Sequence, residues 1–161
     1  MDAEHPLDGI VDNLVYGPVQ LHEAGVDLTV GAVYEVTNPG RLDFGGDELE
    51  DAELEPVETI ARDPDDEYEW WTLEVGHYVI QHNEFLAEDD VELFLQARND
   101  LLARGGSHPS LVVEGHLPLV PLSVGGAGLS LKENARVSTL RTLPGVTGAP
   151  DDERLGEVTD I

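Results

Sequence analysis

Cysteine is absent from the 161 residues of this chain, and positive charge is scarce. Without cysteine the chain can form no disulfide, no thiolate metal site and no cysteine nucleophile. Only eight residues are lysine or arginine, against 34 aspartates and glutamates, which gives a formal net charge of −26. Binding to a phosphate backbone requires clustered cationic side chains, so we expect no nucleic-acid partner.

Long apolar runs are also missing. No stretch approaches the roughly 18 apolar residues of a membrane helix, and residues 1–6 show no basic segment leading into an apolar one. We therefore expect no membrane association and a cytoplasmic location. The acidic surface, with Lys132 as the single lysine, predicts a halophilic protein that folds in molar salt, where the screening length falls to about 3 Å.

The sequence does contain many short segments with the composition of β-strands. Its length suits one domain, and 40% of its residues are hydrophobic. Segments with strand composition occupy residues 28–36, 68–75, 77–81, 91–96, 111–114, 117–124, 129–131 and 136–143. A helical period is absent, apart from a short helix expected near residues 99–103. Many short strands separated by turns predict an all-β fold, either a sandwich, a jelly roll or a barrel.

Two segments depart from this pattern. Residues 43–66 are dense in carboxylates and chain breakers. Blocks of like charge stay hydrated, so we interpret this segment as a solvated insertion or long hairpin and not as a metal cluster. Residues 144–161 lack apolar periodicity and are predicted to form a flexible tail. The predicted organisation is a β domain over residues 1–143, with an acidic insertion near 43–66, followed by this tail.

Several familiar sites can be set aside. His77 and His82 are five residues apart in a predicted strand, so they point to opposite faces and do not suit one metal ion. No serine lies in a Gly-x-Ser-x-Gly turn, and no Gly-x-x-x-x-Gly-Lys phosphate loop occurs. The sequence therefore carries neither a serine-hydrolase nor a P-loop signature.

The scarce arginines are more informative. Arg98 and Arg104 frame a short block that ends in Gly106. A guanidinium group binds phosphate oxygens through two parallel hydrogen bonds and stays charged at any working pH. The block is thus a candidate for binding an anionic ligand. The alternative is that both arginines pair with neighbouring carboxylates as surface ion pairs.

Five blocks occur in the order of the motifs of one family. They are residues 23–28 (Ala-Gly-aromatic-Asp-Leu), 76–84 (glycine, strand, glutamate), 98–106 (Arg-Ser-Ser/Gly-Leu-Ala-x-Lys/Arg-x-Gly), 112–115 (Ile-Asp) and 134–137 (Gly-x-Arg-Ile). From Gln20 to Leu143 the chain resembles the trimeric dUTPase and dCTP deaminase superfamily, in a haloarchaeal-type form with divergent motifs.

This resemblance implies a distorted β-barrel or jelly-roll fold and a homotrimer with its sites between subunits. The implied reaction is hydrolysis of dUTP to dUMP and diphosphate, with Mg²⁺ as cofactor. Glu114 would orient or deprotonate the attacking water, and Asp27 would be structural or reach magnesium through water. The deoxynucleoside triphosphate would be bound by Arg98, Asn99, Arg104, Gly106 and His116.

Departures from the motifs leave other functions open. Asn99 and Asp100 replace the serines that hold phosphates, Glu114 replaces an aspartate, and Thr139 replaces a glutamine. One alternative is a catalytically degenerate relative that binds a nucleotide or a protein partner. A dCTP deaminase homologue is another, although Ser123 or Val124 stands where the deaminating glutamate is expected. An unrelated β-sandwich interaction domain is the third.

Overall fold

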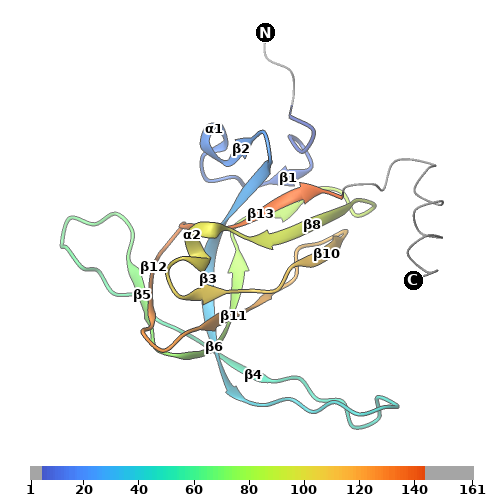
Figure 1. The fold of residues 1–161 in the computed structure, drawn as a ribbon, viewed down its shortest axis with the longest axis vertical. Helices are drawn as coiled ribbons and strands as arrows, with labels where there is room; N and C mark the ends of the chain where they lie inside the picture. Colours follow the sequence, from blue (N-terminus) through green and yellow to red (C-terminus); the bar gives the residue numbers. More distant parts are fainter. Residues whose placement is uncertain (1–4, 144–161) are drawn as a thin grey trace.

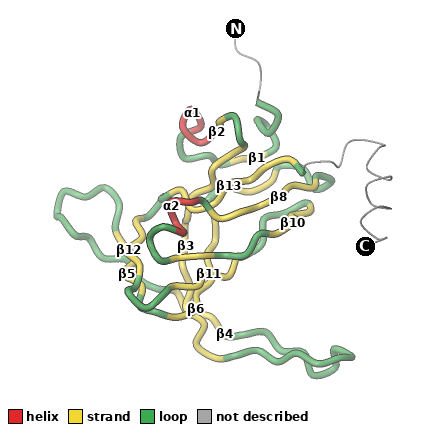
Figure 2. The backbone as a smooth tube through the Cα atoms, in the orientation of Figure 1, coloured by secondary structure: helices red, strands yellow, loops and turns green. Residues whose placement is uncertain are grey.

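The computed structural model describes residues 5–143, and the predicted tail lies outside the described residues. The described chain is almost entirely β-structure, with two helices of one turn each (Figures 1 and 2). Its elements are β1 (Val11–Asp12), α1 (Gly17–Gln20), β2 (Leu21–His22), β3 (Gly25–Asn38), β4 (Glu53–Pro56), β5 (Trp70–Leu73), β6 (Gly76–His82), β7 (Phe85–Leu86), β8 (Glu92–Ala97), α2 (Asn99–Leu102), β9 (Gly106–Ser107), β10 (Leu111–Glu114), β11 (Val120–Val124), β12 (Leu129–Lys132) and β13 (Arg136–Thr142). The predicted all-β class is confirmed.

One curled sheet of nine strands dominates, in the order β10-β8-β13-β3-β6-β11-β9, with β2 and β4 also paired to β3. The first half of β3 pairs with β13 and its second half with β6, both antiparallel. Because β3 serves two partners along its length, the sheet bends around it into a half-barrel (Figure 1). Two small sheets, β1-β7 and β12-β5, complete the described structure.

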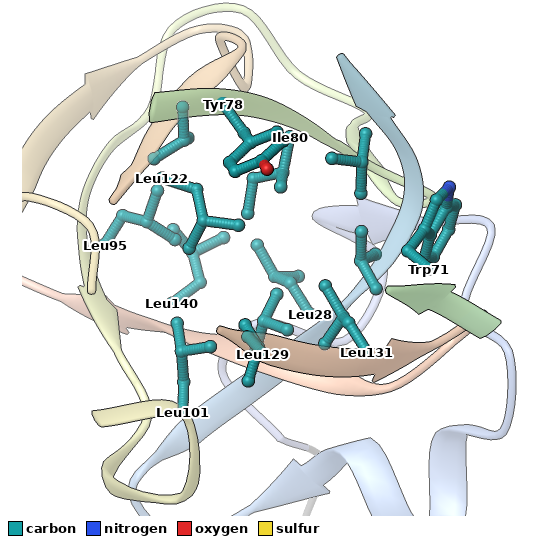
Figure 3. Packing of buried hydrophobic residues seen from close by; sticks show 14 of the residues in the cluster. Leu28, Trp71, Tyr78, Ile80, Leu95, Leu101, Leu122, Leu129, Leu131 and Leu140 are labelled. Atoms are coloured by element: carbon teal, nitrogen blue, oxygen red, sulfur yellow. The ribbon is translucent and has the colours of Figure 1, made fainter. Parts of the chain in front are cut away.

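The core fills the inside of this curl. Along β11, Val120, Leu122 and Val124 are buried while the two residues between them are exposed, which is the alternation of a strand with one solvated face. Figure 3 shows side chains from several strands converging, Leu28 and Leu140 among them. No helix in the described part of the chain is long and apolar enough to cross a membrane.

An arm projects from the body where β3 continues past β6 and pairs with β4 (Figure 1). Beyond the paired strands, Arg41 and Glu50 join the two sides through backbone hydrogen bonds and a 3.1 Å ion pair. The acidic segment 43–66 begins at the tip of this arm and continues through β4 toward β5. Most of its carboxylates are exposed, so they remain hydrated.

A bulge in β13 decides which side chains share a face. The pairing with β3 shifts register between Arg136 and Ser138, so Val137 is an extra residue in the strand. Val137 and Ser138 are both buried, whereas Arg136 and Thr139 point outward into the same pocket. In a regular strand, two residues three apart would lie on opposite faces.

Candidate functional site

An open pocket of about 730 Å³ lies on the outer side of the sheet beside α2. It is lined by Val19, His22, Ala24, Asp27, Gln96, Ala97, Arg98, Asn99, Asp100, Arg136, Thr139 and Arg141. Three of the eight lysines and arginines of the chain are therefore gathered in one depression. In a protein with a net charge of −26, this arginine pocket is a local concentration of positive charge that suits an anion.

Asp27, on β3, organises the arginine pocket. Its side chain is buried, and both carboxylate oxygens are engaged. Oδ1 accepts hydrogen bonds from His22 Nε2 at 2.7 Å and Thr139 Oγ1 at 2.8 Å. Oδ2 accepts a hydrogen bond from Arg136 Nη1 at 3.1 Å and lies 3.4 Å from Arg98 Nε. One carboxylate thus fixes two guanidinium groups at the pocket.

The ionisation of Asp27 follows from these contacts. Burial by itself would raise the pKa of the carboxyl, but hydrogen bonds from His22 and Thr139 and the charge of Arg98 lower the pKa below its ordinary value. Asp27 is therefore a carboxylate at neutral pH and offsets part of the arginine charge. Three protein donors use most of the roughly four acceptor positions of this carboxylate, and its role toward a magnesium-bound water stays a prediction.

His22 belongs to the site, although no sequence pattern singles it out. The backbone N–H of Ala24 donates to His22 Nδ1 at 3.1 Å, so in the neutral ring the proton sits on Nε2. Nε2 can then donate to Asp27 Oδ1, which is the contact observed. The tight pairing of β2 with β3 brings the two residues together, since Leu21 lies opposite Val26 and His22 opposite Gly25.

A second polar network supports β3 behind the pocket. Gln20 donates to the Asp27 carbonyl at 2.9 Å and to Glu84 Oε2 at 2.8 Å. Glu84 also accepts from the backbone N–H and the hydroxyl of Thr29. All four residues are buried, so these bonds satisfy polar groups that would otherwise destabilise the core.

The predicted phosphate block is divided between two pockets. Arg98 and Asn99 line the arginine pocket, with Arg98 just before α2. Arg104 instead lines a neighbouring cavity of about 610 Å³ beside β5 and the β11–β12 turn. Asp100 Oδ2 lies 3.2 Å from Arg98 Nη1, and Asp100 Oδ1 lies 3.8 Å from Arg104 Nη1. The ion pairs left open as the alternative therefore do form, with one aspartate serving both arginines.

The other predicted site residues lie elsewhere in the chain. Glu114 is exposed at the end of β10, opposite Glu92 on β8. A hydrogen bond with the Glu114 carboxyl, and then its charge, raise the pKa of Glu92. His116 lines a third cavity of about 540 Å³. Gly106 is buried at a position where a Cβ would lie 2.7 Å from Leu101 Cδ1, so its space is filled by the core.

One chain therefore brings together Asp27, Arg98 and Asn99, and leaves Glu114 outside the arginine pocket. Among residues 5–143, no group of three or more histidines and carboxylates is placed to bind a metal ion. Mg²⁺ prefers carboxylates together with substrate phosphates, and the buried carboxylate of the arginine pocket, Asp27, already accepts three hydrogen bonds from the protein. Residues 5–143 of one copy therefore hold no ready-made set of ligands for a resident magnesium ion.

The fold and the pocket define an all-β protein with an arginine-lined pocket that suits an anion, beside a curled sheet. No family model matches the chain. Over 84 residues, or 52% of the chain, it is 36% identical to proteins named "Probable deoxyuridine 5'-triphosphate nucleotidohydrolase" from two strains of Halobacterium salinarum. The chain spans about half the length of these curated relatives, 49%. This partial match supports a relationship with dUTPases, in agreement with the motif resemblance.

Proposed function

We propose that this protein hydrolyses dUTP to dUMP and diphosphate. The observation that carries the proposal is the gathering of Arg98, Arg136 and Arg141 around buried Asp27 in an otherwise acidic chain. A triphosphate is the nucleotide group with the highest density of negative charge, and planar guanidinium groups match its oxygens. The partial similarity to dUTPases then favours dUTP over other triphosphates.

Arginines fixed before substrate arrives also favour catalysis. Asp27 holds Arg98 and Arg136 in place, so these side chains need little reorganisation when a triphosphate binds. Preorganised positive charge stabilises the charge that develops on the phosphoryl oxygens as the leaving diphosphate departs. Arg98 and Arg136 would orient the phosphate chain, with Asn99 as a neutral donor beside them. Magnesium would arrive as part of the substrate, on the triphosphate.

A second copy of the chain would supply the carboxylate that activates water. Glu114 ends β10, which is an edge strand of the large sheet, and exposed Val112 lies on the same strand. Beside the arginine pocket, Tyr16 and Val19 are also exposed apolar side chains. Joining these two surfaces would bury apolar area, cover a free strand edge and bring Glu114 toward the arginines.

Such a contact joins two different surfaces, and repeating it generates a ring when the rotation between successive copies closes. We propose a homotrimer of this kind, with each site composed of the arginine pocket of one copy and Glu114 and His116 of the next. Glu114 would act as the general base toward water, and His116 would contact the sugar of the nucleotide.

The degenerate binder remains the second candidate, and one contact favours it. Asp100 places a carboxylate 3.2 Å from Arg98, where a phosphate oxygen would have to compete. A binder without catalysis would respond to dUTP by an increase in melting temperature, with no diphosphate formed.

The deciding experiment is a substrate panel. Diphosphate release is measured with dUTP, dCTP and dTTP in molar KCl with magnesium, for the wild type, Glu114→Gln and the exposed-carboxylate control Glu55→Gln. We expect turnover of dUTP, a loss of about a hundredfold in Glu114→Gln, and wild-type rates in the control. Melting temperature with dUTP and ammonia release from dCTP are recorded on the same proteins. A melting shift without turnover would establish the degenerate binder, and deamination of dCTP would establish the deaminase.

A further inference from the structure

A chain of three buried polar side chains crosses the core where the anion site does not reach. His82 ends β6, His108 follows β9, and Ser138 belongs to β13. Their exposed fractions are 7%, 8% and 0%. The Nε2 atoms of both histidines lie 2.8 Å from Ser138 Oγ. Three segments far apart in sequence thus meet at one hydroxyl group.

The positions of the protons follow from the partners. His108 Nδ1 lies 2.9 Å from the Pro109 carbonyl, which only accepts, so this nitrogen carries a proton. In the neutral ring His108 Nε2 is then an acceptor, and it takes the single proton of the Ser138 hydroxyl. The remaining bond runs the other way, from His82 Nε2–H to Ser138 Oγ. His82 Nδ1 is left bare and has no partner.

This arrangement of hydrogen bonds is therefore consistent only with a neutral His82. A proton added to Nδ1 would have no acceptor, and burial, with the charge of His108, lowers the pKa of His82 to about 4. Burial also lowers the pKa of His108. At neutral pH both rings are uncharged, and the hydrogen bonds keep a fixed direction.

Ser138 sits next to the bulge of β13. On one side of it, Arg136 donates to Asp27 Oδ2, and on the other, Thr139 donates to Asp27 Oδ1. Both contacts depend on the bulge, because it puts Arg136 and Thr139 on the outer face while Val137 and Ser138 point into the core. The two histidines hold the Ser138 hydroxyl in that inward position.

We propose that the His82–Ser138–His108 chain is a positioning device that fixes the β13 bulge and thereby holds Arg136 and Thr139 on Asp27. Its consequence for catalysis rests on the proposed function. Its structural part concerns only the contact between Arg136 and Asp27, so it can be tested apart from any activity.

The variants separate positioning from plain stability. His82→Gln keeps an N–H donor at about the reach of Nε2. His82→Met removes the donor and fills the space with an apolar side chain. Ile80→Val is the matched control, because Ile80 is buried on the same strand and its truncation also destabilises the core.

The first readout is a double-mutant cycle on the free energy of unfolding in molar KCl. Arg136→Met destabilises the wild type through loss of the Asp27 contact. If His82 holds the bulge, Arg136→Met costs about half as much or less in His82→Met, and the full amount in His82→Gln and Ile80→Val. An equal cost of Arg136→Met in all four backgrounds would overturn the proposal, whether or not the protein hydrolyses dUTP.

The second readout is steady-state hydrolysis of dUTP. His82→Met should lower kcat/KM by about tenfold or more, His82→Gln should stay within about threefold of the wild type, and Ile80→Val within about twofold. Equal losses in His82→Met and Ile80→Val would mean that His82 only stabilises the core. A wild type without turnover would contradict the proposed function and leave the double-mutant cycle to decide the positioning role.

Discussion

Replacing Asp27 with asparagine should lower the free energy of unfolding by about 3 kcal/mol and reduce dUTP hydrolysis by about a hundredfold. The carboxylate is buried, accepts hydrogen bonds from His22, Thr139 and Arg136, and forms ion pairs with two guanidinium groups. An amide removes the charge that offsets these arginines and places an NH₂ donor against other donors. Removing one partner of a buried ion pair costs more than the pair contributes, because the remaining charge stays desolvated.

The matched control for this change is Asp12→Asn, which removes an exposed carboxylate. Both proteins are unfolded with urea in molar KCl at pH 7. We expect the control to stay within about 0.5 kcal/mol of the wild type. Because the folded pKa of Asp27 is lowered, its contribution is complete above the ordinary value of 3.8 and is lost only as the pH falls below it. A stable and active Asp27→Asn protein would show that Asp27 does not organise the pocket.

Mild acid should destabilise the protein through protonation of His82 in the unfolded chain. The ordinary pKa of histidine is 6.5 and that of folded His82 is about 4, so the unfolded chain binds a proton that the folded chain does not. Stability is then complete above about pH 6.5 and is lost as the pH falls toward 4. This difference corresponds to at most about 3 kcal/mol, of which about 2 kcal/mol is lost by pH 5.

The titratable groups near His82 either share its lowered pKa or lie outside the hydrogen bonds that join His82, Ser138 and His108. His108, across Ser138, also has a lowered pKa, while Glu84 and His116 line the same cavity as His82. Urea unfolding at pH 7.5, 6 and 5 in molar KCl measures the loss. The fall of the free energy of unfolding with decreasing pH should be smaller in His82→Gln than in the wild type. It should be unchanged in His77→Gln, which removes an exposed histidine of the same strand. Identical slopes for the wild type and His82→Gln would contradict a neutral buried His82.

Much of the fold could be predicted from the sequence, because alternation and turn residues are local signals. The predicted segments correspond to β3, β5, β6, β8, β10, β11, β12 and β13, and the short predicted helix to α2. The strands β1, β2, β7 and β9 have two residues each, too few for alternation to appear. β4 was missed because its strand pattern is hidden among the carboxylates of the acidic segment.

The site was less accessible to sequence reasoning. Arg98 and Asp27 stand out because cations are rare and the motif contains an aspartate, and the structure places the two side chains together. The place of Arg136 and Thr139 depends on a bulge, and a one-residue register shift leaves no mark in the hydrophobic pattern. His22 depends on the β2–β3 turn in the same way. The roles of Glu114, His116, Arg104 and Gly106 stay predictions.

Mixing two inactive variants tests the composite site most directly. Arg98→Ala removes one arginine from the pocket of its own copy, and Glu114→Gln removes the carboxylate that would serve a neighbouring copy. If each site takes Arg98 from one copy and Glu114 from the next, a random mixture restores both groups in about one quarter of the sites. The variants are unfolded together, refolded at equal amounts in molar KCl and assayed for diphosphate release from dUTP beside the wild type.

We expect each variant alone to show no more than about 1% of the wild-type rate and the co-refolded mixture to reach about 25%. Separately refolded proteins, combined afterwards, are the control for slow exchange between oligomers. Wild-type turnover with no gain in the co-refolded mixture would contradict a site shared between copies, and a wild type that releases no diphosphate would contradict the proposed hydrolysis itself.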